Sequence, residues 1–162
     1  MRKLNKGDSN SLTKHANNYN IAKFLTNEFP HPYSISDAKK FIEMTYQEFP
    51  MRTFGIEING EIAGVISVVP ISDNKSRIVG ELGYWLSEDY WNNGITTLAI
   101  KKIVKYAFKT FKFDYILANP FVDNLASQKV LKKVGFKLKS KNSQNIIKNK
   151  IVHEVLIFCI VP

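Results

Sequence analysis

The chain has a single cysteine, Cys159, among its 162 residues, which excludes an intrachain disulfide framework. Its place in the apolar run VLIFCIV predicts a buried thiol. The only histidines, at positions 15, 31 and 153, lack metal-ligand spacing. No apolar run reaches the ~18–20 residues that span a bilayer, and the start MRKLNKGDSNS lacks the apolar segment of a secretory signal. We therefore expect a cytoplasmic protein with no metal site and no membrane segment.

Arginine is scarce, although the chain is strongly basic. Lysine and arginine together number 23 against 14 acidic residues, a net charge of +9, and only positions 2, 52 and 77 are arginine. Specific nucleic-acid readers rely on arginine forks for base contacts, whereas lysines spread along helices usually form a solvated surface. The composition therefore disfavours a specific nucleic-acid partner, and it is compatible with a polyphosphate ligand.

The length allows one core but not two, and no linker or repeat divides the chain, so we expect a single domain over residues 1–162. Residues 3–8 are left open between a short strand and a frayed end. Helical periodicity and capping signals predict helices at residues 11–25, 37–49, 95–111 and 124–134, with Ser34 or Ser36 capping the second. Alternation and turn signals predict strands at residues 53–58, 61–71, 77–86, 114–118, 136–141 and 146–161.

Three turns are expected to connect the predicted strands into antiparallel pairs. Asn59-Gly60 is a strong hairpin signal between the first two strands. Asp73-Asn74-Lys75 is expected to turn the chain into the third strand, and the polar residues 142–145 are expected to join the last two.

The most informative stretch runs from Gly80 to Phe136. A strand at residues 81–86 is followed by the turn Asn92-Asn93-Gly94 and then directly by an amphipathic helix. A short turn before a helix points several backbone N–H groups and the positive end of the helix dipole at one place. An ordinary strand–helix connection has the same appearance, but the arrangement also suits a phosphate group.

Three motifs in this stretch resemble the Gcn5-related N-acetyltransferase (GNAT) superfamily, and most closely its branch of ribosomal-protein N-terminal acetyltransferases. They are GYWLSEDYWNNG at 83–94, NLAS at 124–127 and VLKKVGF at 130–136, and the resemblance extends from FPHPYSISDAKKFI at 29–42 to the final strand. It implies an α/β fold (a mixed, α+β-like arrangement) with a mostly antiparallel central sheet of about six or seven strands. A parallel, splayed pair is expected at its centre, with about four flanking helices. The implied cofactor is acetyl-CoA.

The resemblance also assigns the cofactor-binding residues. Leu86, at the end of the central strand, is placed as the backbone donor to the thioester carbonyl. The family's pyrophosphate loop maps onto Trp91-Asn92-Asn93-Gly94-Ile95-Thr96, with Thr97 following and Asn124 contacting the cofactor arm. Two positions depart from the family pattern. Trp91 replaces arginine or glutamine, as is usual in this branch, and Thr96 replaces glycine or alanine, so that its side chain either weakens phosphate binding or donates its hydroxyl to it.

Two residues are candidates for moving protons. Glu81 is the candidate general base, and the alternative is a strand carboxylate that is exposed or paired with a lysine or arginine. Ser127 is the candidate acid for the leaving thiolate as well as a cofactor contact, and the alternative is a first-turn helix residue beside the cap Asn124. Glu81, Tyr84, His31 and Tyr33 are the candidate substrate-binding residues. Tyr84 and Trp85 alternate along the strand, so that one of them faces the site and the other the core.

Three functions remain open at this stage. The first is an acetyl-CoA-dependent N-acetyltransferase that acts by direct transfer on a primary amine, with a protein or peptide α-amine ahead of a polyamine, amino sugar or amino acid. The second is an acyl-CoA-binding module without catalysis. The third is a basic nucleic-acid-binding domain, which ranks low because no motif supports it. A homodimer is left open.

Overall fold

The computed structural model describes residues 1–72 and 77–162, and the side chains of these residues apart from 140–144. The helical elements are η1 (Lys6–Asp8), α1 (Ser9–Ala16), α2 (Tyr19–Ala22), α3 (Ile35–Thr45), η2 (Glu88–Tyr90), α4 (Ile95–Phe111) and α5 (Leu125–Val134). The strands are β1 (Thr53–Ile58), β2 (Glu61–Ile71), β3 (Val79–Leu86), β4 (Tyr115–Ala118), β5 (Lys137–Lys148) and β6 (Ile151–Ile160).

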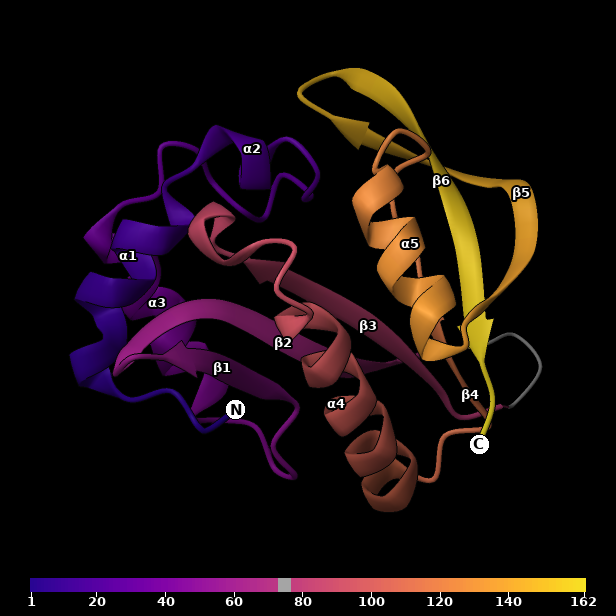
Figure 1. The fold of residues 1–162 in the computed structure, drawn as a ribbon, viewed down its shortest axis with the longest axis horizontal. Helices are drawn as coiled ribbons and strands as arrows, with labels where there is room; N and C mark the ends of the chain where they lie inside the picture. The colour runs from indigo at the N-terminus through magenta and orange to yellow at the C-terminus, as the bar shows by residue number, and fades with distance from the viewer. Residues whose placement is uncertain (73–76) are drawn as a thin grey trace.

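The six strands form one sheet in the order β1-β2-β3-β4-β6-β5 (Figure 1). Every neighbouring pair is antiparallel except β3 and β4, which are parallel and lie in the middle of the sheet. The predicted mixed sheet with a central parallel pair is therefore confirmed. Within the described ranges, no helix is both long and apolar enough to cross a membrane.

Two apolar clusters cover the two faces of the sheet. The larger contains buried residues of α4 and α5 packed on the strands, with Ile100, Ile103 and Phe158 fully buried. The smaller joins α1 and α3 to the other face through Leu12, Ile42 and other residues. In α4 the buried residues recur at helical spacing and the lysines between them are exposed, so the amphipathic pattern alone orients this helix.

Local signals placed several elements correctly. The predicted ranges of β1, β2 and α4 agree with the structure, and Asn59 (φ 51°) and Gly60 (φ 84°) form the expected left-handed hairpin turn. Gly135 ends α5 with φ 110°.

The boundaries of two other elements differ from the prediction. Ser34, rather than Ser36, caps α3, which ends at Thr45 instead of residue 49. The third strand begins at Val79 rather than residue 77, and the expected turn at Asp73–Lys75 lies outside the described residues.

The single helix predicted at residues 11–25 is wrong, because two asparagines divide it. Asn17 ends α1, and the Asn17 side-chain oxygen accepts a hydrogen bond from the backbone N–H of Tyr33 at 3.0 Å. Asn18 has extended backbone and caps α2 through the N–H of Asn20. Asparagine side chains compete with helical hydrogen bonds in this way, so the amphipathic pattern across them did not give a continuous helix.

The predicted loop at residues 142–145 is also wrong, because β5 continues through it. Irregular pairing on either side of Ser140 carries β5 to Lys148, and the turn is at Asn149 and Lys150, which have φ 50° and 67°. The Lys148 ammonium donates to the backbone oxygens of Ala22 and Leu25, the latter at 2.7 Å. The hairpin tip therefore lies against the α2 segment (Figure 1), a long-range contact that no local signal indicates.

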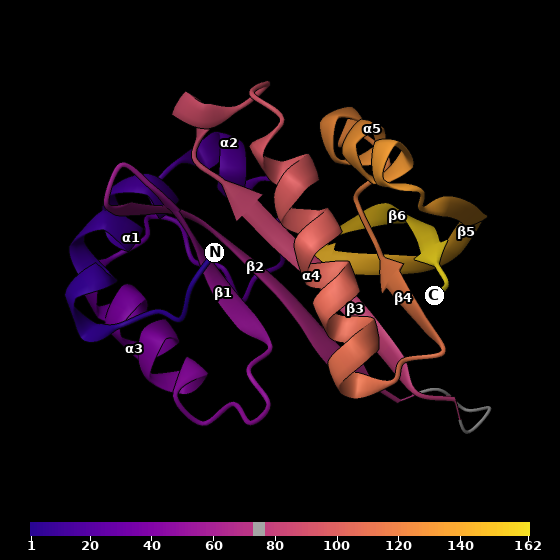
Figure 2. The ribbon, with the colours of Figure 1, turned by 60° about the horizontal axis from the view of Figure 1, so that its bottom comes forward.

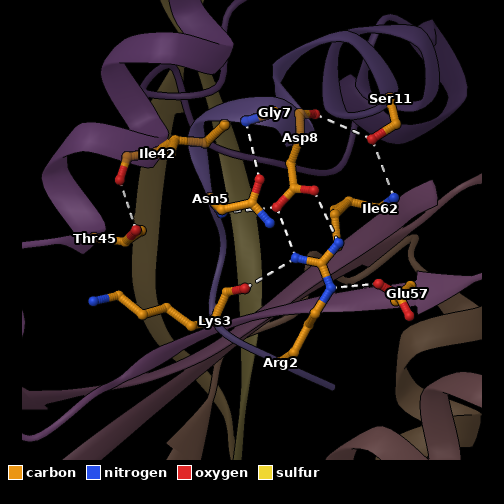
Figure 3. A network of polar contacts seen from close by, with 10 residues as sticks. All are labelled: Arg2, Lys3, Asn5, Gly7, Asp8, Ser11, Ile42, Thr45, Glu57 and Ile62. Carbon is orange, nitrogen blue, oxygen red and sulfur yellow. Dashed lines mark hydrogen bonds and ion pairs between the residues drawn. The ribbon is translucent and has the colours of Figure 1, made fainter. Parts of the chain in front are cut away.

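The N-terminal residues, left open by the sequence, are held by an ion-pair network (Figure 3). Arg2 forms an isolated bridge with Gly55, and its guanidinium donates two hydrogen bonds to Asp8 at 2.8 and 2.9 Å and one to Glu57. Burial raises the pKa of Asp8, but the hydrogen bonds from Arg2 and from the N–H of Asn5 outweigh it, so that the net pKa is lowered.

Asp8→Asn is expected to lower the free energy of unfolding by about 1–3 kcal/mol at neutral pH, because it breaks a charge-assisted pair whose Asp8 side chain is only 8% exposed. A carboxylate with a lowered folded pKa stabilises the protein above its unfolded pKa and loses this contribution as the pH falls through the folded value. The difference between wild type and variant in urea denaturation should therefore shrink below about pH 4. A difference that is independent of pH would contradict this account.

Candidate active site

The centre of the sheet contains a fork between β3 and β4. Their parallel pairing comprises Val79 with Tyr115, Gly80 with Ile116 and Glu81 with Leu117, and it ends there. Strand β3 continues to Leu86, paired only with β2, while β4 ends at Ala118. Figure 2 shows the two strands diverging in the direction of α5 and the start of α4. We call this region, from Glu81–Leu117 to Leu86, the strand fork.

Backbone N–H groups of β3 face the fork. The N–H of Ser87 donates to Ala63 at 2.7 Å, which makes Ser87 and Ala63 a hydrogen-bonded pair. Because bonding alternates along an antiparallel ladder, Leu86 and Tyr84 direct their backbone groups away from β2. In agreement with this, the Leu86 carbonyl accepts the indole N–H of Trp91 at 2.7 Å. The backbone position predicted for Leu86 is thus at the fork.

The side chains of β3 divide between the two faces of the sheet. Leu82, Tyr84 and Leu86 belong to the cluster under α4 and α5, whereas Trp85 packs with the cluster under α1 and α3. This answers the question that alternation alone left open: Tyr84 points toward α5, and Trp85 contacts Phe29 at 5.9 Å between ring centroids. Because side chains alternate along a strand, Glu81 lies on the same face of β3 as Trp85 and on the opposite face from Tyr84.

Tyr84 and Ser127 meet beside the fork. Their hydroxyl oxygens are 2.7 Å apart, and the backbone N–H of Ser127 donates to the Asn124 side chain at 3.1 Å. The helix cap therefore fixes the backbone of Ser127, while its hydroxyl is directed to Tyr84. Burial raises the pKa of Tyr84 to about 12, and the hydrogen bond with Ser127 lowers it less than burial raises it. The phenol is protonated at neutral pH, so both members of the pair carry a hydroxyl proton.

The turn before α4 has left-handed backbone and leaves the helix start without a side-chain cap. Asn92 and Gly94 both have left-handed backbone, with φ 63° and 75°. Gly94 is the N-cap of the 17-residue α4, and no side chain caps this helix end. A Cβ placed on Gly94 would meet no atom within 4 Å. Exposed backbone N–H groups in a left-handed turn at a helix N-terminus are the usual cradle for phosphate.

The other residues of the turn contribute mainly through their backbone. Trp91 holds the Leu86 carbonyl, and the Asn93 amide donates to the carbonyl of Trp91 at 3.1 Å. The Thr97 side chain is buried and Ile95 packs against the larger cluster, so neither side chain is free at the helix end. Thr96 is half-buried, and its hydroxyl remains a candidate phosphate donor.

Side chains from the α1 and α2 segments bind Ser87 and Glu88, which lie between the strand fork and the turn before α4. His15 is buried and contacts Ser87 at 3.0 Å through Nδ1 and Glu61 at 2.8 Å through Nε2. The Glu88 carboxylate accepts hydrogen bonds from the amides of Asn18 and Asn20. None of these contacts was predicted, because they join residues about 46 to 72 positions apart.

A contact that sequence reasoning missed concerns Glu81. Its Oε1 accepts a hydrogen bond at 2.8 Å from the side-chain amide of Asn119, which follows β4 directly. An asparagine before a proline is typical of a turn, so no local signal indicates this pair. Glu81 is half-buried and is held at the fork by an amide rather than by a lysine or arginine.

The predicted substrate residues His31 and Tyr33 differ in exposure. Tyr33 is 6% exposed and packs on Phe29, and burial raises its pKa to about 12. His31 is exposed, with its ring 5.7 Å from that of Tyr19. Tyr33 thus supports the aromatic wall formed by Phe29 and Trp85, while His31 lies on the surface of the same loop.

Comparisons with known proteins agree with this architecture. The family model described as Acetyltransferase (GNAT) domain matches residues 1–137. The uncharacterized N-acetyltransferase YoaA of Bacillus subtilis is 30% identical over 118 residues, which cover 72% of this chain and 66% of YoaA. The putative ribosomal N-acetyltransferase YdaF of the same organism is 25% identical over 104 residues, which cover 64% of this chain and 56% of YdaF. The match thus spans less than two thirds of each of these relatives.

Solved structures share the fold. The crystal structure of spermidine N-acetyltransferase from Vibrio cholerae, in complex with CoA and spermine, superposes with a TM-score of 0.77 and 19% identity, over 99% of this chain and 93% of that one.

Proposed function

This chain belongs to the acetyltransferase (GNAT) family, and on that premise we propose that it transfers an acetyl group from acetyl-CoA to a primary amine, with the α-amine of a protein or peptide favoured. The observation that carries the proposal is the strand fork. It brings the N–H of Leu86, the Glu81 carboxylate and the Tyr84–Ser127 pair to one region, with the uncapped start of α4 on the same side of the sheet as Tyr84.

The residues of the turn fit the phosphate groups of coenzyme A. Left-handed backbone at Asn92 and Gly94 and the open space in front of Gly94 leave room for a pyrophosphate to approach the N–H groups of residues 94–97. Acetyl-CoA, when bound, supplies the acetyl group as a thioester. Asn124 and Ser127 are at the start of α5, on the same face of the sheet as Tyr84. We assign them to the arm of coenzyme A.

The chain's own residues then have separate tasks. Leu86 offers a backbone N–H to the acyl oxygen, as acyl transfer requires. Glu81 accepts a proton from the amine, directly or through a water molecule. The Ser127 hydroxyl, supported by Tyr84, returns a proton to the sulfur as the C–S bond breaks and the C–N bond forms. Glu81 and Ser127 act from opposite faces of β3, so that the two proton transfers do not compete.

A protein or peptide α-amine is favoured over a polyamine for two reasons. One curated relative carries the name of a putative ribosomal N-acetyltransferase, and the motifs resemble that branch. A polyamine is a polycation, and a protein of net charge +9 repels it at long range. The polyamine is nevertheless the second candidate, because the spermidine enzyme has the same fold.

The test is thiol release by the purified chain with acetyl-CoA and a panel of amines. We expect release to depend on the amine, and peptides with a free α-amine should give a higher kcat/KM than spermidine or an amino sugar. N-terminally blocked versions of the same peptides should give none. Binding of coenzyme A without thiol release from any amine would support the non-catalytic module instead.

Ser127→Ala is expected to reduce kcat about 10-fold with little change in KM, because the hydroxyl acts after both substrates are bound. The same change leaves the partly buried phenol of Tyr84 without its partner, which should lower the free energy of unfolding by about 1 kcal/mol. Tyr84→Phe is the matched variant, since it keeps the serine and removes the other half of the pair. Wild-type kcat in Ser127→Ala, with reduced thermal stability, would assign Ser127 to structure alone.

A further inference from the structure

Asn119 joins two features of the strand fork that no sequence motif connects. It follows the last residue of β4, and its side-chain amide N–H donates to Glu81 Oε1 at 2.8 Å. Glu81 is also the last residue of β3 that pairs with β4, opposite Leu117. The hydrogen bond therefore spans the two strands at the point where they separate.

The segment after Asn119 is anchored to β6, which keeps the amide in place. The carbonyl of Pro120 accepts the N–H of Leu156 at 2.9 Å, and the N–H of Val122 donates to Glu154 at 3.0 Å. Phe121 forms an isolated bridge with Val155 and is buried. A side chain on such a segment can hold a carboxylate in one orientation, because its own backbone is fixed by neighbours on both sides.

Of the two polar groups of the Asn119 side chain, the amide nitrogen has a hydrogen-bond partner among the described residues and the oxygen has none. An ionised carboxylate only accepts hydrogen bonds, so the amide must turn its nitrogen to Glu81 and its oxygen the other way. That oxygen, Asn119 Oδ1, is buried and has no hydrogen-bond partner among the described residues. An unpaired buried acceptor is costly to a fold. Asn119 therefore contributes less to stability than a fully paired asparagine, which points to a role for its N–H at Glu81.

The space next to Glu81 on its face of the sheet is open. Two residues further along β3 is Gly83, which is exposed, and a Cβ placed there would meet only the Ser67 hydroxyl at an ordinary 3.6 Å. Trp85, next on the same face, belongs to the aromatic wall with Phe29. Because Asn119 binds Oε1 of Glu81, the second carboxylate oxygen, Oε2, is the one available to an acceptor amine that lies over Gly83.

We infer that Asn119 is the positioning residue of Glu81: its amide fixes Oε1 so that Oε2 is presented to the amine that enters over Gly83. The inference rests on the proposed function, in which Glu81 accepts the proton of the amine. Asn119 itself takes no proton and acts only through Glu81. Its effect must therefore disappear when Glu81 can no longer act as a base, and this requirement separates positioning from a purely structural role.

The experiment is a double-mutant cycle on the purified chain, with the best peptide of the panel as acceptor. Asn119→Leu removes the donor at similar size and should lower kcat about 10- to 100-fold, with less than about a 3-fold change in the KM for the amine. In the Glu81→Gln background the same change should alter kcat less than about 2-fold. The increase of melting temperature with coenzyme A should be the same in all four proteins, which controls for folding and for the phosphate turn.

Asn119→Asp is the second variant, in case leucine disturbs the fold, because it keeps the shape and replaces the donor by an acceptor. It should lower kcat at least as much as Asn119→Leu, since two carboxylates would then face each other. Equal fold-losses in the wild-type and Glu81→Gln backgrounds, or wild-type kcat in both Asn119 variants, would overturn the inference alone. Wild-type kcat in Glu81→Gln would overturn the assignment of the base and the positioning role together.

Discussion

Glu81→Gln is expected to lower kcat about 10²–10⁴-fold and to leave coenzyme A affinity nearly unchanged. The substitution keeps the length of the side chain and its contact distance to Asn119, but an amide cannot accept the proton that the amine must lose. Coenzyme A binds at the α4 turn and α5 in our proposal, on the other face of β3, so its affinity should not respond. Steady-state kinetics with the best peptide acceptor, together with a coenzyme A titration, measure both quantities.

Glu57→Gln provides a matched control for this variant. Glu57 is also a strand glutamate held by a side-chain donor, Arg2, but it lies on β1 at the edge of the sheet. Its substitution is expected to affect stability slightly and kcat not at all, because an exposed ion pair contributes little and Glu57 is remote from the fork. Near-normal turnover in Glu81→Gln would mean that a water molecule or another group accepts the proton.

Gly94→Val is expected to abolish the binding of coenzyme A. In the wild type, coenzyme A at about 100 times its Kd should raise the melting temperature by roughly 5–10 °C, and the variant should show no increase at the same concentration. A side chain at Gly94 would project into the space in front of the α4 N-terminus, which is now open, and a β-branched residue also resists φ 75°. Thermal unfolding with and without coenzyme A is the measurement.

Backbone strain alone would lower stability without explaining a loss of binding, so Gly60→Val is the matched control. Gly60 has φ 84° and equally open surroundings, but it lies in the β1–β2 hairpin turn. Both valine variants should lose stability to a similar degree, and only Gly94→Val should lose the response to coenzyme A. Retained binding in Gly94→Val would remove the phosphate assignment from this turn.

Much of the fold was predictable from short-range signals. Asn59-Gly60 fixed the hairpin of β1 and β2, because two adjacent residues with left-handed backbone match the twist of the strands. The strict apolar spacing of residues 95–111 set both ends and the buried face of α4. The turn around Gly94 was predicted in the same way, since a glycine directly before an amphipathic helix leaves the first N–H groups exposed. Each of these features depends on signals between residues that are adjacent in the sequence or one helical turn apart, repeated along α4 in the case of the helix.

Where local signals conflicted, the sequence misled. Asn17 and Asn18 interrupt a run that is otherwise amphipathic, and the break is supported by the contact of Asn17 with Tyr33, 16 residues later. The polar residues 142–145 suggested a loop, but pairing with β6 carries the backbone of β5 past them to Lys148. In both cases a partner distant in the sequence, rather than local propensity, decided the structure.

The sequence by itself determined most of the order of the elements, the turn before α4 and, through its motifs, the family. The tertiary structure decided which side chains meet at the fork. Whether Tyr84 or Trp85 faces α5 depends on the register of β3, because a shift of one residue exchanges the two faces. The pairing of Glu81 with Asn119 exists only because β3 and β4 are parallel neighbours that separate after Leu117. Such contacts join residues 38 positions apart, and only the packed sheet brings them within hydrogen-bonding distance.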